Sequence, residues 1–119
     1  MKKTEQQSEE ITPEDARILK EDFFEHYANR LKKDPEELAG YKKYLIDQYN
    51  KDEDLALFLE GLKIVAKAER KIQVLAKAAK VERTSVYRML SKGNNISFNS
   101  FVTFIKTLGY KVSFSLAHK

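Results

Sequence analysis

Apolar side chains recur at intervals of three and four residues along most of this chain, and this spacing constrains the fold more than any other feature. An α-helix has about 3.6 residues per turn, so apolar residues spaced in this way line one face and predict a helix. The first such stripe is Ile18, Leu19, Phe23, Phe24, Tyr27, Ala28 and Leu31, and the second is Leu38, Tyr41, Tyr44, Leu45 and Tyr49.

Residues with strong positional preferences predict where these two helices begin. Thr12 followed by Pro13 is a typical start, because proline fits the first helical position, where its missing N–H costs nothing. Asp34, Pro35 and Glu37 repeat this signal with the spacing of a capping box. Because only two residues separate the helices, we expect them to pair as an antiparallel hairpin.

The second half of the chain contains further helical patterns. Gly109 follows the last of them, where a helix stop with a positive φ favours glycine. The scarcity of glycine (4 residues) and proline (2 residues) agrees with a mainly α class, and 119 residues suit a small domain with an accessory segment. We expect helices from about Asp52 or Asp54 to Ala68, over about 73–79, about 84–91 and about 98–107.

The chain therefore divides into three parts. Residues 1–10 are polar and aperiodic and predict a disordered lead-in, residues 11–50 form the N-terminal helical hairpin, and residues 51–119 form a second helical unit. The aromatic residues of the hairpin have helical spacing, so we interpret them as core or as a protein-binding surface in preference to a platform for stacked bases.

The C-terminal segment has a different period. Tyr110, Val112, Phe114 and Leu116 alternate with polar residues, which is typical of a short β-strand. No other segment of this chain has strand periodicity, so the strand needs a partner elsewhere. We expect these four residues to form a homodimer contact by pairing with the same segment of a second copy. The alternative is a tail packed on its own helices.

Charge separates the two halves of the chain. Residues 1–50 hold 9 basic and 12 acidic residues, a net charge of −3, whereas residues 51–119 hold 13 and 6, a net charge of +7. From Arg83 to the C-terminus there are six basic residues and no acidic one. One-sided positive charge suits a polyanionic partner, because each neutralised phosphate releases counterions. A basic surface that only maintains solubility is the alternative.

The stretch "LAKAAKVERTSVYRML" has the pattern of a helix-turn-helix. This motif requires two short helices with apolar inner faces, a small residue where they approach, and a turn of about four residues. Ala76 is the small residue, and the inner faces are supplied by Leu75, Ala79, Val81, Val86, Met89 and Leu90.

The longer run "LAKAAKVERTSVYRMLSKGNNISFNSFVTFIKTLGYKVSF" resembles the addiction-module antidote (Hig-like antitoxin) branch of the Cro/CI-like repressors. The likeness covers roughly residues 55–116. Two positions depart from the pattern. Lys80 stands where glycine is usual, so it is expected to adopt a left-handed conformation, and Ile96 stands where proline is common.

The resemblance implies a sequence-specific repressor of double-stranded DNA, with a near-palindromic operator read by a dimer. Arg88 is the best candidate for a bidentate guanine contact. A solvated surface arginine is the alternative for Arg88, a packed ring for Tyr87, and a helix cap for Thr84 or Ser85. The full set of expected DNA contacts is Gln73, Arg83, Thr84, Ser85, Tyr87, Arg88, Lys92, Asn94 and Asn95.

The resemblance also implies that the protein is an antitoxin whose partner is a Rel-like ribonuclease toxin. Two other functions remain open: a phage-type repressor without a toxin, and a protein-interaction module that has lost DNA binding. We expect no enzyme activity, cofactor or metal site, because cysteine is absent and neither His26 nor His118 has ligand spacing. With no apolar signal or spanning segment in the sequence, we expect a cytoplasmic protein that does not enter membranes.

Overall fold

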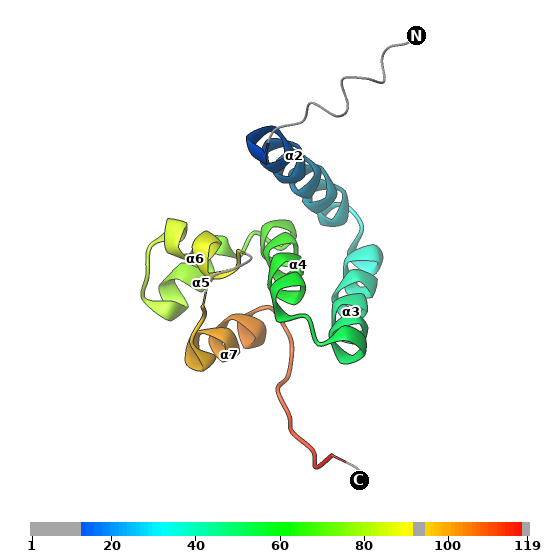
Figure 1. The fold of residues 1–119 in the computed structure, drawn as a ribbon, viewed down its shortest axis with the longest axis vertical. Helices are drawn as coiled ribbons and strands as arrows, with labels where there is room; N and C mark the ends of the chain where they lie inside the picture. Colours follow the sequence, from blue (N-terminus) through cyan, green and yellow to red (C-terminus); the bar gives the residue numbers. More distant parts are fainter. Residues whose placement is uncertain (1–12, 92–94, 118–119) are drawn as a thin grey trace.

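The computed structural model describes residues 13–91 and 95–117, and these residues form six helices, which confirms the mainly α class. The expected cap Thr12 and the lead-in over residues 1–10 lie outside the described residues. In Figure 1, α4 lies near the middle of the molecule, with α5, α6 and α7 to its left, α3 to its right and α2 above it. The helices are α2 (Pro13–Lys32), α3 (Pro35–Asp52), α4 (Leu55–Ala68), α5 (Ile72–Ala79), α6 (Arg83–Met89) and α7 (Phe98–Thr107).

The predicted start signals of α3 and α4 form capping hydrogen bonds. The backbone N–H of Glu37 donates to Asp34 Oδ1 at 3.0 Å, and the N–H of Leu57 donates to Asp54 Oδ1 at 3.1 Å. Each bond satisfies a donor that has no partner within its own helix. The carboxylate of Glu37 pairs with Arg30 of α2 at 3.0 Å, so it links the two helices across their turn.

The central helix, α4, is buried on two faces that serve different parts of the molecule. Leu62 and Val65 are fully buried among residues of α5, α6 and α7. Ile64 and Ala68 pack instead against Ala28 and Leu31 of α2. Full burial of a leucine or valine side chain contributes about 1.5–3 kcal/mol. Since its two faces belong to two separate clusters, α4 joins both halves of the chain.

A glycine allows α3 to approach α4 closely. A Cβ atom placed on Gly61 would collide with the side chain of Leu45, which is itself buried at this contact. The space that glycine leaves is therefore filled by a leucine from the neighbouring helix. Although glycine costs about 1 kcal/mol relative to alanine in a helix, here its lack of a side chain is required by the packing.

The two N-terminal helices meet at the turn formed by Lys33 and Asp34. Near this turn the rings of Tyr27 and Tyr41 make an edge-to-face contact with centroids 5.2 Å apart. Figure 1 shows α2 and α3 diverging from the turn, and each of them packs against α4. Their position therefore depends on α4 as much as on each other. None of the helices in the described chain is long and apolar enough to cross a membrane.

The C-terminal segment corrects one prediction. Gly109 ends α7 with a φ of 93°, as expected, but residues 110–117 form no strand. Alternation of apolar residues gives a strand only where a second strand supplies hydrogen-bonding partners, and the described residues offer none. Tyr110 and Val112 pack against the core of their own chain, whereas Phe114 and Leu116 are 85% and 95% exposed. The tail is thus buried against its own helices in its first part, and farther along it keeps, among the described residues, only a ring contact between Phe114 and Phe98 of α7, with centroids 6.5 Å apart.

Candidate nucleic-acid interface

Two short helices, α5 and α6, are joined by a turn centred on Lys80. Lys80 has φ 59° and ψ 45°, which confirms the expected left-handed conformation. The N–H of Val81 donates to the carbonyl of Ala76 at 3.0 Å, and that of Lys80 donates to Lys77 at 3.2 Å. These bonds satisfy carbonyls at the end of α5 and offset the cost of about 1–2 kcal/mol for a residue with a side chain in this conformation.

The inner faces of the α5–α6 pair are closed by apolar packing. Ala76 is almost completely buried, which agrees with its expected place where the helices approach. Leu75, Val86 and Leu90 are fully buried, and Phe104 of α7 lies in the same cluster. This packing fixes α6 relative to α5, so the side chains on the outer face of α6 project from a rigid base.

The residues expected to contact DNA lie mostly on the outer face of this pair. Most of them are exposed, whereas two on α6 are half-buried. Lys92 and Asn94 lie outside the described residues. The exposed residues are Gln73, Arg83, Thr84, Arg88 and Asn95, and the half-buried residues are Ser85 and Tyr87.

Side chains along α6 hold one another in place. A guanidinium nitrogen of Arg88 donates to Ser85 Oγ at 3.1 Å, and one of Arg83 donates to the Tyr87 hydroxyl at 3.3 Å. The Tyr87 ring also lies near two cations, Arg83 at 5.7 Å and Lys67 of α4 at 5.5 Å from its centroid. The Tyr87 ring is therefore partly packed, and its hydroxyl accepts a hydrogen bond from Arg83 in the free protein.

Neither serine nor threonine caps the start of α6. The residue before the helix is Glu82, and no side chain makes a capping hydrogen bond there. The helix begins at Arg83, one residue earlier than the sequence pattern predicts. Thr84 and Ser85 consequently lie within the first turn, where the hydroxyl of Thr84 takes part in no hydrogen bond among the described residues.

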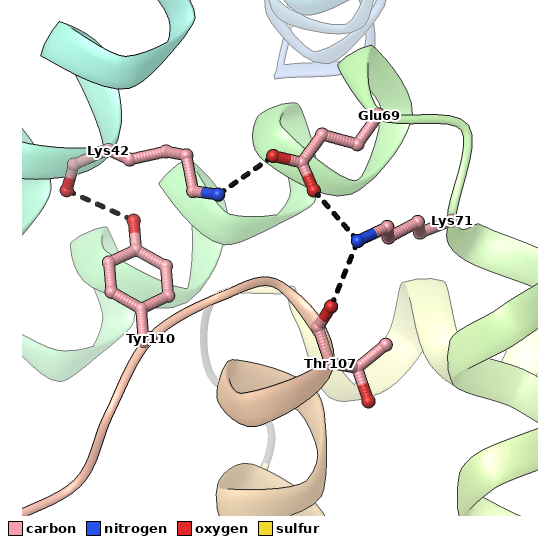
Figure 2. Close-up of polar contacts among 5 residues, drawn as sticks. All are labelled: Lys42, Glu69, Lys71, Thr107 and Tyr110. Carbon is pink, nitrogen blue, oxygen red and sulfur yellow. Dashed lines mark hydrogen bonds and ion pairs between the residues drawn. The ribbon is translucent and has the colours of Figure 1, made fainter.

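A network of polar contacts fixes the entry to α5 (Figure 2). Glu69, between α4 and α5, accepts a hydrogen bond from Lys42 of α3 at 2.8 Å. Its other oxygen lies 3.4 Å from Lys71 Nζ, which donates to the carbonyl of Thr107 at 3.1 Å. That oxygen of Glu69 accepts no hydrogen bond among the described residues, so the contact with Lys71 is an ion pair by proximity only. The network thus connects α3, α4, α5 and the end of α7.

Tyr110 joins this network from the tail. Its hydroxyl donates to the carbonyl of Lys42 at 3.0 Å, and the Lys42 ammonium lies 5.7 Å from the ring centroid. A Cβ atom at Gly109 would lie 3.0 Å from Lys42 Nζ, but that atom ends a flexible side chain, so the φ of 93° is the stronger reason for glycine here. Burial raises the pKa of Tyr110, and also that of Tyr41, well above the ordinary value of 10.0.

Three basic residues lie beside this surface, although they are not among the DNA contacts expected from the sequence. They are Lys32 at the end of α2, Lys67 on α4 and Arg70 between α4 and α5, and they lie around the same hollow as Gln73 and Arg83. Lys32 belongs to the acidic half of the chain and lies outside the helix-turn-helix motif. Neither the charge distribution nor the motif could therefore predict that it lies at this surface. Only the packing of α2 across α4 brings it here.

Among the described residues, no group of three or more His, Cys, Asp or Glu side chains is arranged to hold a metal ion. His26 is exposed on α2, and His118 lies outside the described residues. The chain matches no protein-family model, and neither curated proteins nor solved structures gave a match. Its likeness to the Cro/CI-like repressors is accordingly a prediction from the sequence motif.

Proposed function

We propose that this protein is a sequence-specific DNA-binding repressor that uses α5 and α6 as a helix-turn-helix. The observation that carries the proposal is the α5–α6 pair itself: two short helices with a shared buried face, and basic and hydroxyl side chains on the outer face of the second. An exposed helix of this kind fits the major groove of DNA, where donors and acceptors identify each base pair.

Arg88 is the proposed reader of a base, and its neighbours hold the backbone. The hydrogen bond of Arg88 to Ser85 keeps the guanidinium above the face of α6 in the free protein. On binding, the same donors turn to a guanine edge, while Gln73 and Arg83 contact phosphates. A bidentate pair of this type contributes about 1–3 kcal/mol of discrimination between bases.

The repressor is proposed to act as a homodimer. Phe114 and Leu116 project from the tail with most of their surface exposed. Phe114 lines an apolar hollow of about 610 Å³, together with residues that include Ile46, Leu55 and Phe98. A second copy that covers this hollow would bury both tails without requiring the strand that the free chain lacks. Two recognition helices would then read half-sites about 34 Å apart, or a multiple of that distance, in a near-palindromic operator.

The proposed second partner is a Rel-like ribonuclease toxin, with the protein acting in the cytoplasm as its antitoxin. The N-terminal half is acidic overall, and it exposes aromatic rings such as Phe23, at 61%, and Tyr44, at 53%. Aromatic residues within a surface of one charge suit an oppositely charged protein partner. A cationic toxin surface has the required charge.

The proposal is tested by titrating the purified protein against its own upstream DNA and a scrambled duplex at several salt concentrations. A repressor binds the upstream fragment more tightly, with an affinity that falls steeply as salt rises. Co-purification with the product of a neighbouring small gene would then support the antitoxin function, and its absence would favour a phage-type repressor. Equal or absent binding to both duplexes would favour a protein-interaction module.

Substitutions separate base reading from backbone binding. Arg88→Ala is expected to lose about 1–3 kcal/mol of discrimination between operator and scrambled DNA. Lys92→Ala is expected to weaken binding to both duplexes and to lower the salt slope by about 1. If both variants lose affinity equally on both duplexes, Arg88 has no role in reading a base.

A further inference from the structure

A hollow lies between the N-terminal helix and the helix pair that we propose as the DNA reader. Its volume is about 330 Å³, room for roughly ten water molecules at about 30 Å³ each. A hydrated phosphate group therefore fits it. The lining residues come from α2, from the end of α4, from α5 and from α6, and those with polar groups are Glu25, Asn29, Lys32, Lys67, Arg70, Gln73, Arg83 and Tyr87.

The charges around this hollow are strongly one-sided. Four of its residues are cations, and one, Glu25, is an anion. Lys67 donates a hydrogen bond to Glu25 at 2.8 Å, so this pair is internally compensated. The contact also lowers the pKa of Glu25 and keeps it ionised. A net positive charge remains on Lys32, Arg70 and Arg83.

Two of these cations are not used to hold the fold. Among residues 13–91 and 95–117, no carboxylate lies within ion-pair distance of Lys32 or Arg70, and neither side chain donates a hydrogen bond. Both are exposed. Lys32, Arg70 and Arg83 lie around one hollow, so an anion bound there would be attracted by all three charges.

The position of the hollow indicates which anion binds there. Gln73, Arg83 and Tyr87, three of the proposed DNA contacts, line it together with Asn29 and Lys32 of α2. A DNA strand that reaches Gln73 and Arg83 therefore brings its phosphates to the mouth of the hollow. The N-terminal half thus contributes to the same face as α6, although its overall charge is negative.

We propose that this hollow binds a phosphate of the DNA backbone, with Lys32 and Arg70 as its principal contacts. The DNA interface then extends from the helix-turn-helix onto the end of α2, and α2 helps to set the register of the protein on the duplex. This inference rests on the proposed DNA-binding function. It assigns to the N-terminal half a role in DNA binding that neither its sequence nor its charge predicted.

The test compares Lys32→Gln with Lys33→Gln, using the full-length protein and both duplexes. Lys33 is the next residue, is also exposed and does not line the hollow, so it is a matched control. Loss of one phosphate contact is expected to lower the salt slope by about 0.9 and to weaken binding roughly five- to tenfold at 0.1 M salt on both duplexes. Lys33→Gln is expected to keep the slope of the unmodified protein.

The outcomes distinguish this inference from the function on which it rests. If the unmodified protein binds its operator with a steep salt slope and Lys32→Gln and Arg70→Gln both keep that slope, the phosphate site is wrong and the repressor function stands. If Lys33→Gln lowers the slope as much as Lys32→Gln, the effect is one of overall charge and the site is again wrong. If the unmodified protein binds no DNA, both proposals fall. Circular dichroism of each variant verifies that the helices are intact.

Discussion

The two halves of this molecule are held in different ways, although both depend on α4. The unit formed by α4, α5, α6 and α7 encloses one large cluster, which includes Leu62, Leu75 and Phe104 and takes in Leu45 of α3. The smaller cluster joins α4 to α2, with partly buried residues of α3 at its edge, and leaves aromatic residues such as Phe23 exposed. The α4–α7 unit together with α3 has the interior of an independent domain, whereas α2 resembles an attachment to it.

This difference bears on how the proposed functions are divided. A helix that reads bases must be held rigidly, and the large cluster provides that rigidity for α6. An attached segment that opens at a lower free energy than the core suits exchange between partners. The hollow proposed to bind a phosphate lies where α2 meets the α5–α6 pair, so under this proposal α2 affects DNA binding while the residues that contact bases remain on the rigid unit.

The largest expected effect comes from opening the large cluster. Phe104→Ala removes a fully buried ring and is expected to lower the free energy of unfolding by about 3–5 kcal/mol. This is a large part of the roughly 5–15 kcal/mol that stabilises a typical domain. Urea denaturation followed by circular dichroism measures the loss. Phe98→Ala, on the same helix but 61% exposed, is the control, and an equal loss there would contradict the packing described for α7.

A substitution in the smaller cluster tests whether α2 is an attachment. Leu31→Ala removes a fully buried side chain and is expected to cost about 2–4 kcal/mol locally. Hydrogen exchange should then show loss of protection in α2, with α5, α6 and α7 unchanged. Phe23→Ala, on the exposed face of the same helix, should leave protection intact. Equal loss of protection in all helices would show instead that the two halves unfold as one unit.

The sequence predicted more of the large cluster than of its attachment. Helix positions followed from apolar spacing and the conformation of Gly109 from its place at a helix end, whereas that of Lys80 was expected from the resemblance, in which glycine is usual at this position. Such features depend on residues that are close in sequence. The strand over residues 110–116 was wrong because alternation does not supply a hydrogen-bonding partner. The hollow beside Gln73 could not be predicted, because it depends on how α2 crosses α4.

Alkaline titration tests the contact between the two halves. Tyr41 of α3 is half-buried between the clusters, and burial holds its pKa above the ordinary value of 10.0 in the folded state. Its protonated form therefore stabilises the fold fully below about pH 10, and this contribution is lost as pH rises further. Tyr41→Phe should reduce the loss of stability between pH 10 and 11 by roughly 1 kcal/mol. Thermal unfolding of both proteins between pH 10 and 11 measures this difference in stability. Identical pH profiles would mean that burial does not raise the pKa of Tyr41.

The smallest expected effect concerns Glu25, the one acidic residue among the described residues that line the proposed phosphate site. Glu25 accepts a hydrogen bond from Lys67 at 2.8 Å, and its side chain is 56% exposed. Lys67 is only 18% exposed, but glutamine keeps an acceptor for it, so Glu25→Gln should lower the unfolding midpoint only slightly. The substitution removes a negative charge close to the proposed phosphate, and frees Lys67 to face it. Binding to both duplexes should therefore strengthen roughly threefold at 0.1 M salt.

The control for this substitution is Asp22→Asn, also on α2, which removes an exposed carboxylate that does not line the hollow. Its effect on DNA binding should be smaller, because exposed charges farther from the phosphate are screened over about 10 Å at 0.1 M salt. If Asp22→Asn strengthens binding as much as Glu25→Gln, α2 acts on DNA only through its overall charge. If Glu25→Gln alone strengthens binding, the end of α2 belongs to the DNA-binding face. DNA binding would then involve residues from both the acidic half (residues 1–50) and the basic half (residues 51–119) of the chain.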